Sequence, residues 1–368
     1  MSEKIISFIF TKGRSIRIGD ENSAKEFLYT YNFFKEEYKQ TNLFEYLENN
    51  NSSKFIEFID KILRKITGLP FYLEQRPTTS QKNILSKSDY IVYTSHRHGL
   101  SSLPYFLIKK KNRNLSVIVM GLIKESYGHK FKNYIAFLIL STLFRVYDNF
   151  IFLSKGEHMK ASLKFNKYSY KFKFLPFSID TDFWKKNNYS KKNNLILFIG
   201  NDGNREYEKV VELVNEMNDY SFLLITSKIK KQDLKNQNFK LIEGDWSKNN
   251  YSDRDIREFY EQAKLVILPL KESLQPSGQS VALQAMSMEV PVMITQTEGF
   301  WDYSKFFHNE NIFFVKNNET KNWKYSINKV LNDDELLKKV SNNGYITVQD
   351  NYKLDKFYIS LKKILKIT

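Results

Sequence analysis

Short apolar runs alternate with longer segments of helical periodicity along the whole chain. In the first half, five runs are predicted to be strands: Lys4–Phe10, Tyr90–Ser95, Leu115–Gly121, Asn149–Ser154 and Lys171–Phe177. Ser23–Tyr38 begins with a serine suited to a helix cap and carries apolar residues at helical spacing, which predicts one helix. Uninterrupted apolar strands between helices are typical of parallel sheets covered on both faces.

The pattern stops in a polar stretch and then restarts. Residues 185–194 are polar, charged and without apolar periodicity, which predicts an interdomain linker. Beyond it, the predicted strands are Leu195–Asn201, Ser221–Ser227, Phe239–Gly244, Leu265–Leu270, Pro291–Thr295 and Asn311–Lys316, and the predicted helices are Arg205–Met217, Asp253–Ala263 and Val281–Met288. We therefore predict an α/β protein in which two Rossmann-like domains, residues 1–184 and 195–350, face across a cleft, with a C-terminal helix in residues 351–368.

Composition and charge narrow the function only in part. The 368 residues include no cysteine, which excludes disulfides, thiolate metal sites and a cysteine nucleophile. The net charge of +16 is uneven, because residues 1–184 hold 29 Lys and Arg against 17 Asp and Glu, while residues 185–368 hold 28 against 24. A basic surface suits nucleic acid, an anionic membrane or a phosphorylated ligand. The positive charge is explained equally well by an Asn- and Lys-rich composition that only favours solubility.

Nothing in the sequence predicts a secretory signal or a membrane span. The start of the chain has a short apolar run but lacks a basic leader region and a small-residue cleavage site. The longest apolar stretch, Tyr134–Tyr147, is interrupted by Arg145 and falls short of the ~20 residues that cross a bilayer. We expect a core helix there, and a cytoplasmic protein.

A glycine-bearing loop after Leu265–Leu270 is the first candidate for a binding site. In open parallel sheets, ligands bind beyond the carboxyl ends of the strands, where loops lead into helices. Gly278 allows close backbone approach, and the N–H groups of Gln279, Ser280 and Val281 at the helix start would attract an anion. The Gln284 amide suits a pair of sugar hydroxyls. The alternative is a connecting loop whose glycine only eases packing.

A second segment, FIGNDGNRE (residues 198–206), also predicts a strand that leads through a glycine-bearing turn into a helix. It lacks the full dinucleotide fingerprint G-x-G-x-x-G, so an NAD site is poorly supported. Arg205 at the helix start suits a diphosphate through its paired donors, and Gly200 and Asn201 line the same turn. Lys228, after the next strand, is a further candidate cation. The alternative for both basic residues is simple exposure to solvent.

At these motifs the sequence resembles the two-Rossmann GT-B glycosyltransferases, and its second half is similar to glycosyltransferase family 4. PSGQSVALQAMSMEVPV resembles the family's donor-binding loop and helix, E-G-F-G-x-x-x-x-E-A-M-A-x-G-x-P-V. KFLPFSIDTDFW resembles the segment that enters the interdomain linker, and GNDGNREYE resembles the turn that holds the donor diphosphate. Three motifs in the expected order make this resemblance specific. The changed residues of the donor loop resemble a sub-branch that carries SGQSxxLQAM.

The chain departs from the family pattern at several positions. The two family glutamates fall on Pro276 and Gln284, and a one-residue insertion would put Gln275 at the first position instead. The Pro276 side chain cannot form a hydrogen bond with a sugar, so that contact is either lost or supplied by a neighbour such as Gln275, Ser277 or Gln279. Glu289 stands where glycine is common. These departures leave the sugar undetermined.

The resemblance implies sugar transfer from a nucleoside-diphosphate sugar to an acceptor hydroxyl, with retention and without a metal or other cofactor. Arg205 would stabilise the departing diphosphate. The expected donor-binding residues are Gly200, Asn201, Lys228, Ser277, Gly278, Gln279, Ser280, Val281 and Gln284. Ile242–Trp246 would lie near the base, whose identity stays open, and Thr297–Tyr303 would border the sugar. The expected acceptor is a glycan or a lipid-linked precursor of surface polysaccharide or glycolipid, and an anionic membrane surface on the cytoplasmic side is a candidate partner.

The first half supplies the acceptor-side candidates. His96, Arg97, His98 and Gly99 follow a predicted strand, and we expect His96 to act in proton transfer. Gly13 and Arg14 lie in a basic loop after the first strand, and a solvated loop is the alternative there. The H-x-H pair has no third ligand in sight, so we predict no metal site.

Two other functional classes remain in view. A basic nucleic-acid-binding protein would use the same charge, but no RNA-recognition or zinc-finger signature is present, so we expect no nucleic-acid partner. A non-catalytic GT-B relative that binds a sugar nucleotide or a protein partner would explain the missing glutamates.

Overall fold

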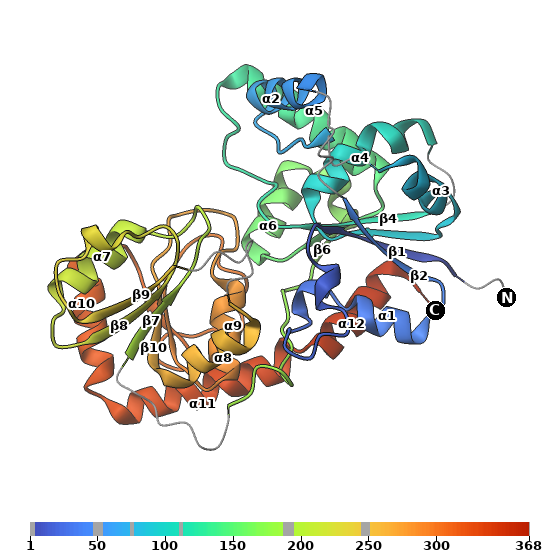
Figure 1. Ribbon diagram of the computed structural model, residues 1–368. Helices are drawn as coiled ribbons and strands as arrows, with labels where there is room; N and C mark the ends of the chain where they lie inside the picture. The colour runs from blue at the N-terminus through green and yellow to red at the C-terminus, as the bar shows by residue number, and fades with distance from the viewer. Residues whose placement is uncertain are drawn as a thin grey trace. The chain divides into compact units, whose positions relative to one another are not determined.

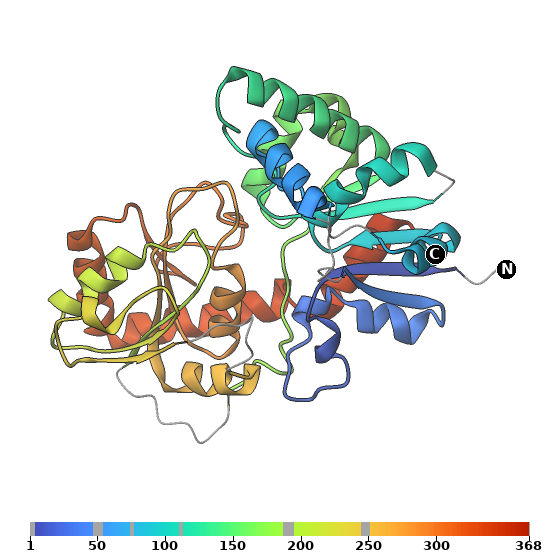
Figure 2. The same cartoon turned by 45° about the horizontal axis from the view of Figure 1, so that its top comes forward.

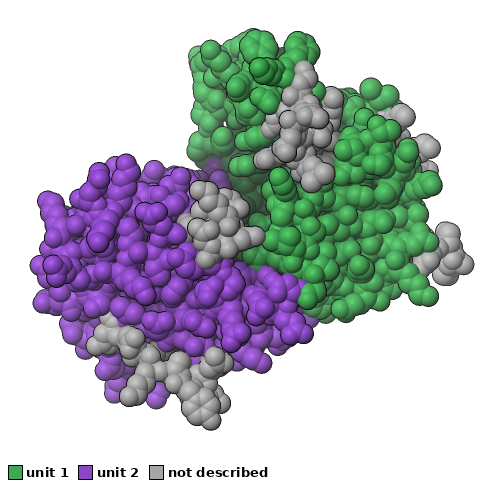
Figure 3. Space-filling view, viewed as in Figure 1, with its two compact units in different colours: residues 1–19, 27–176, 357–368 green, residues 20–26, 177–356 purple. Residues whose placement is uncertain are grey.

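The computed structural model describes residues 4–46, 54–73, 77–109, 113–186, 195–243 and 251–367. The chain forms two compact units, each assembled from more than one stretch (Figure 3). Unit 1 contains residues 1–19, 27–176 and 357–368, and unit 2 contains residues 20–26 and 177–356. The stretch 20–26 therefore lies in unit 2, the last helix passes into unit 1, and residues 187–194 of the predicted linker fall outside the described residues.

Unit 1 is built on a six-stranded parallel sheet in the order β2-β1-β3-β4-β5-β6 (Figure 1). The strands are β1 (Ile6–Thr11), β2 (Thr41–Tyr46), β3 (Tyr90–Tyr93), β4 (Asn114–Val119), β5 (Asn149–Phe152) and β6 (Phe172–Phe174). The helices are α1 (Tyr31–Glu37), α2 (Lys54–Thr67), α3 (Thr79–Lys87), α4 (His96–Lys109), α5 (Lys130–Val146), α6 (Lys155–Lys164) and most of α12 (Leu354–Leu365). Since β1 lies between β2 and β3, the winding direction reverses between β1 and β3.

Unit 2 holds a second six-stranded parallel sheet, in the order β12-β11-β10-β7-β8-β9. The strands are β7 (Leu195–Ile199), β8 (Ser221–Ile225), β9 (Phe239–Ile242), β10 (Ala263–Leu268), β11 (Val292–Thr295) and β12 (Phe313–Val315), and the helices are α7 (Tyr207–Glu216), α8 (Asp253–Gln262), α9 (Gln279–Ser287), α10 (Thr320–Leu331) and α11 (Asp334–Asn351). Here the winding reverses between β7 and β10. The predicted pair of Rossmann-like α/β domains is confirmed.

Each sheet is buried by the helices that connect its strands. In unit 1 the β1 residues Ile6, Phe8 and Ile9 are fully buried although they point to alternate faces. In unit 2, Ile196 to Ile199 of β7 are likewise inaccessible. Strands covered on both sides are apolar at most positions, which is why their sequences read as apolar runs, and a buried polar residue such as Ser7 is bonded, here to Ser88 Oγ.

The prediction of one helix over Ser23–Tyr38 is wrong. The segment forms a 3-10 turn, Glu26–Leu28, and then α1, because Tyr29 and Thr30 adopt left-handed backbone angles with φ of 44° and 63°. The break lies just after the point where the chain passes from unit 2 to unit 1. The edge strand β2 is a second difference, since its mixed sequence TNLFEY carries no strand pattern.

The apolar segment Tyr134–Tyr147 forms the greater part of α5, as predicted. Ala136, Leu140 and Leu143 face the core, whereas Tyr134 and Leu138 are exposed by 61% and 45%. α5 is thus a core helix on one side only. None of the helices in the described residues is both long enough and apolar enough to cross a membrane.

Candidate functional site

The carboxyl ends of β7 and β10 bring the two glycine-bearing segments of unit 2 together. These strands are neighbours at the reversal of winding, where open parallel sheets bind their ligands. Lys271 N donates to Asn204 O (2.9 Å), Glu206 N donates to Pro269 O (3.0 Å) and Asn204 Nδ2 donates to Ser277 Oγ (2.8 Å). The turn after β7 and the loop after β10 therefore form one bonded structure.

Arg205 occupies the space between these two segments, and its side chain is only 3% exposed. A Cβ atom added to Gly200 would lie 2.5 Å from Arg205 Nε, and one added to Gly278 would lie 3.4 Å from Nη1. The missing side chain at Gly200 leaves the room that the guanidinium fills. Both glycines predicted at the donor site thus adjoin the predicted catalytic arginine.

The guanidinium of Arg205 has few partners of its own. The Asp202 carboxylate, whose side chain is 43% exposed, lies 3.3 Å from Nη1. Within the described part of the chain, neither Nε nor Nη1 has a hydrogen-bond acceptor. A buried cation with unused donors is unfavourable unless an anion completes its shell. The arrangement suits a phosphate-bearing ligand.

The start of α9 adds a second attraction for an anion next to Arg205. Gly278, at φ +75°, is the N-cap of the nine-residue helix and offers no side-chain cap, and the first intrahelical bond runs from Ala282 N to Gly278 O. The N–H groups of Gln279, Ser280 and Val281 precede that bond. Because they point along the helix axis at its positive end, they complement the arginine.

The remaining residues of the predicted donor set have local roles. Asn201 Oδ1 accepts hydrogen bonds from Ser227 N (2.7 Å) and Thr226 Oγ1 (3.0 Å), so it ties the turn after β7 to the turn after β8. Lys228 is exposed beside this junction. The predicted base-side segment Ile242–Trp246 lies outside the described residues from position 244 onward.

The predicted sugar-side segment Thr297–Tyr303 packs against the loop after β10. Glu298 N donates to Glu272 Oε1 (2.7 Å), and a Cβ atom at Gly299 would lie 2.3 Å from Ser273 O. Only glycine allows this close approach of two backbones. The contact fixes the loop that leads to Ser277.

Gln284 lies in a buried polar cluster that no motif of the sequence predicts. Its Nε2 donates to Glu26 Oε1 (2.8 Å), and Tyr260 OH donates to its Oε1 (3.1 Å). Trp184 Nε1 donates to the same Glu26 oxygen (2.8 Å). Both ends of the Gln284 amide are therefore occupied, and the amide reaches a ribose only if one of these bonds opens.

The Glu26 carboxyl group at the centre of this cluster is fully buried. Burial raises its pKa to about 7, and the nearby Asp253 carboxylate adds to the increase. Asp253 Oδ2 in turn accepts from Ala24 N (2.9 Å). A glutamate at 284 would face Glu26, which gives a physical reason for an amide at this position.

In unit 1, the acceptor-side candidates gather at the reversal of winding between β1 and β3. Gly13, at φ +85°, follows β1, and its N–H donates to Glu45 Oε2 (3.1 Å). The Arg14 guanidinium stacks on Phe27 at 4.6 Å. His96 to Gly99 follow β3 and form the first turn of α4.

The two histidines of that turn are buried and neutral. Burial, together with the nearby Arg97 charge, lowers the pKa of His96 to about 3 and that of His98 to about 4. Met120 N donates to His96 Nδ1 (3.4 Å), so this nitrogen already serves as an acceptor. A proton-transfer role for His96 therefore stays a prediction, and it would require Nε2 or the opening of the Nδ1 bond.

Arg97 and Gly99 differ in their surroundings. The Arg97 side chain is exposed and lies over the Tyr72 ring at 5.5 Å. A Cβ atom at Gly99 would lie 2.9 Å from Val117 Cγ2, and Tyr147 OH donates to Gly99 O (2.7 Å). Gly99 thus allows α4 to pack closely on β4, independent of any ligand.

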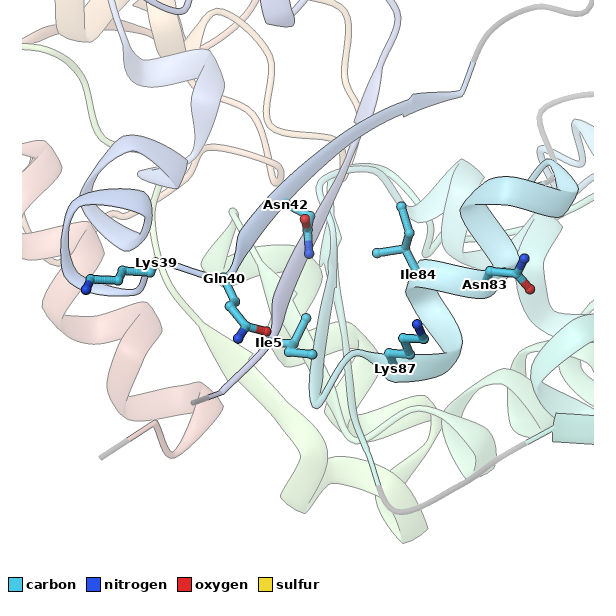
Figure 4. A pocket seen from close by; sticks show the side chains of 7 residues that line it. All are labelled: Ile5, Lys39, Gln40, Asn42, Asn83, Ile84 and Lys87. Carbon is cyan, nitrogen blue, oxygen red and sulfur yellow. The ribbon is translucent and has the colours of Figure 1, made fainter. Parts of the chain in front are cut away.

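Two further observations bear on ligands. In the described ranges, no three His, Cys, Asp or Glu side chains come close enough to hold a metal ion. Unit 1 has a cavity of about 380 Å³ lined by Ile5, Lys39, Gln40, Asn42, Asn83, Ile84 and Lys87 (Figure 4). It lies at the amino ends of β1 and β2, opposite the edge where the candidate residues gather.

Residues 180–347 match the family model described as glycosyl transferases group 1. Among the curated proteins, none matches this chain in sequence.

Three solved structures illustrate the similarity of fold. Anabaena Alr3699/HepE, crystallised with UDP and glucose, has a TM-score of 0.69 at 11% identity, over 99% of this chain and 100% of its own. A sucrose-phosphate synthase from Thermosynechococcus elongatus has a TM-score of 0.67 at 12% identity, over 98% of both chains. A glycosyltransferase from Rickettsia africae has a TM-score of 0.61 at 15% identity, over 100% of both. The chain therefore has the GT-B fold, and its segment 180–347 matches the group 1 glycosyl transferases in sequence.

Proposed function

We propose that this protein is a glycosyltransferase that moves a sugar from a nucleoside-diphosphate sugar to an acceptor hydroxyl. The observation that carries the proposal is the Arg205 guanidinium, buried between Gly200 and Gly278 with donors that lack acceptors, beside the start of α9. A donor diphosphate would supply those acceptors. During transfer the leaving diphosphate gains negative charge, which the arginine and the helix start would stabilise.

The finer features of the reaction are proposals of the same kind. We propose transfer with retention, without a metal ion, by an enzyme similar to family 4, and the motif resemblance supports this. We propose UDP as the first nucleotide to test, because UDP occupies the structure of the similar Anabaena protein. A glycan or lipid-linked acceptor in surface polysaccharide or glycolipid synthesis, on the cytoplasmic side, fits the basic first half of the chain.

Nucleotide binding to unit 2 gives the first test. We expect UDP at a hundredfold excess over its dissociation constant to stabilise the protein by about 2.7 kcal/mol in a thermal-shift series that also includes GDP, ADP and CMP. Arg205→Ala removes a charge-assisted contact of about 1.5–3 kcal/mol, so its affinity for the same nucleotide falls at least about tenfold. Arg254→Ala, at an exposed position of α8 in the same unit, is the matched control and keeps wild-type affinity.

Thermal shifts test binding, and an assay of sugar hydrolysis and transfer then separates an enzyme from a protein that only binds the nucleotide. Equal shifts in wild type and Arg205→Ala, or no shift with any nucleotide, would contradict the donor site. The non-catalytic alternative is favoured by Pro276 and by the occupied amide of Gln284. Nucleotide binding without hydrolysis or transfer of the matching sugar, in buffer with and without EDTA, would support that alternative.

A further inference from the structure

Helix α2 exposes an apolar stripe on its outer side. Phe55, Phe58, Ile62 and Ile66 are exposed by 68%, 59%, 37% and 42%, and they follow one another at intervals of three or four residues. This spacing puts them on one side of the helix. Other residues attach the inner side of α2 to unit 1. Leu63 packs on the core, and the buried Asp60 accepts a hydrogen bond from Leu73 N at 2.8 Å.

Helix α5 also exposes apolar residues. It packs beside α2, as both ribbon views show (Figures 1 and 2). Its exposed apolar residues Phe131, Tyr134, Phe137 and Leu138 are accessible by 63%, 61%, 41% and 45%. We call these four residues and the four of the α2 stripe the α2–α5 face. Apolar surface of this extent on neighbouring helices marks an interaction site.

The charges around this face all favour one kind of partner. Lys54, Lys61 and Lys65 of α2 and Lys130 at the start of α5 are exposed. The α5 sequence contains no acidic residue, and of the two in α2, Asp60 is buried and Glu57 is partly covered. Apolar side chains next to lysines whose long stems reach outward match the boundary between acyl chains and anionic headgroups.

We propose that the α2–α5 face docks this protein on an anionic lipid bilayer, with both helices lying in the interface. At 14 and 17 residues the helices extend roughly 21 Å and 25 Å, which suits an interfacial position. Two copies joined through this face would bring like-charged lysines together, which is unfavourable. Five of the eight residues of this face are aromatic and can also stack on bases, but the aliphatic Ile62, Ile66 and Leu138 gain contacts only among acyl chains.

Flotation of the full-length protein with lipid vesicles tests the proposal. In about 0.1 M salt we expect binding to phosphatidylcholine vesicles that contain phosphatidylglycerol, at least about tenfold stronger than to phosphatidylcholine alone and weakened at about 1 M salt. Phe55→Ser combined with Phe58→Ser removes two inserting rings and lowers binding to the anionic vesicles at least about tenfold. Lys61→Glu combined with Lys65→Glu lowers the preference for anionic vesicles.

The matched control is Tyr325→Ser on α10, because Tyr325 is also an aromatic residue exposed by 68% on a helix. It should bind vesicles as the wild type does, and all variants should keep the wild-type melting temperature because the substituted side chains are exposed. No vesicle binding, or equal binding by the Phe55/Phe58 variant and wild type, would overturn the proposal. A wild-type dimer that the same variant dissolves would also overturn it. Because no nucleotide is present, this result is independent of the proposed sugar transfer.

Discussion

At the scale of single residues, the most informative feature is a mismatch between burial and bonding. Arg205 is 3% exposed, yet two of its nitrogen atoms have no hydrogen-bond acceptor in the described ranges. Gln284 shows the opposite case, because Tyr260 and Glu26 occupy both ends of its amide. Arg205 therefore has donors left for a ligand, whereas the Gln284 amide is already bonded within the protein. A ligand that recruits Gln284 must first replace one of those bonds.

The fit of Arg205 against Gly200 leads to a prediction. Gly200→Ala would place a methyl group 2.5 Å from Nε and force the guanidinium out of its position. We expect nucleotide affinity to fall at least about tenfold. Gly203→Ala is the matched control, because a Cβ atom there meets nothing within 4 Å. Calorimetric titration with UDP measures both, and an unchanged affinity in Gly200→Ala would show that Arg205 does not contact the nucleotide.

At the scale of elements, α9 is defined by a special residue at each end. Gly278 precedes it at φ +75°, and Glu289 follows its C-cap at φ +55°. Val290 N donates to Ala285 O (2.8 Å) and Glu289 N to Met286 O (3.0 Å), the bond pair of a Schellman motif. The left-handed position in that motif normally holds glycine, so Glu289 is strained there.

This helix end predicts a stabilising substitution. Glu289→Gly removes the strain of a left-handed glutamate and should raise the free energy of unfolding by about 0.5–1 kcal/mol in urea denaturation. Its ion pair with Lys186 (3.3 Å) is partly exposed and contributes little, which Lys186→Ala tests. Glu258→Gly, in the middle of α8, is the opposite case and should lower stability by about 1 kcal/mol. Loss of stability in Glu289→Gly would mean that contacts of the glutamate outweigh its strain.

At the scale of the whole molecule, the chain shares segments between its units. Residues 20–26 lie in unit 2 although the chain on either side of them lies in unit 1, and the last helix passes from unit 2 to unit 1. The short segment brings Glu26 into the cluster of Trp184, Tyr260 and Gln284. A buried carboxyl group placed by a distant segment makes stability depend on pH.

The pH dependence has a definite sign. The pKa of Glu26 rises from about 4.5 to about 7 on folding because of burial, so the folded state holds a proton that the unfolded state releases. Stability from this group is present below about pH 4.5 and is lost as the pH rises to about 7. Glu26→Gln keeps an acceptor oxygen for Trp184 and Gln284 without the charge. Relative to wild type, the variant should gain stability across that window, up to about 3 kcal/mol.

Urea denaturation at a series of pH values from 4.5 to 8 measures the difference between the two proteins. The buried Glu157, whose pKa burial also raises, and the buried histidines are the same in both proteins, so their effects cancel. Glu21→Gln, at an exposed position of the same segment, is the control, and its difference from wild type should not change with pH. A difference for Glu26→Gln that is constant over the window would rule out this role for the carboxyl group.

The sequence by itself determined the two parallel sheets, except for the edge strand β2, and the segments that build the candidate donor site. Strands buried on both faces are apolar at most positions, and a turn after such a strand carries glycine where another group approaches closely, so both features are local and readable. The loop at Gly278 and the turn at Gly200 are recognisable for this reason.

Only the tertiary structure decided which distant residues meet. It placed Glu26 against Gln284 across 258 positions, turned the apolar stripe of α2 outward, and broke the helix predicted over Ser23–Tyr38 at Thr30. Periodicity shows that a helix has an apolar side but not whether that side meets the core, and local propensity holds no information about where a chain leaves one unit for another. Those outcomes depend on contacts between segments far apart in the chain, which the long-range packing of the core selects.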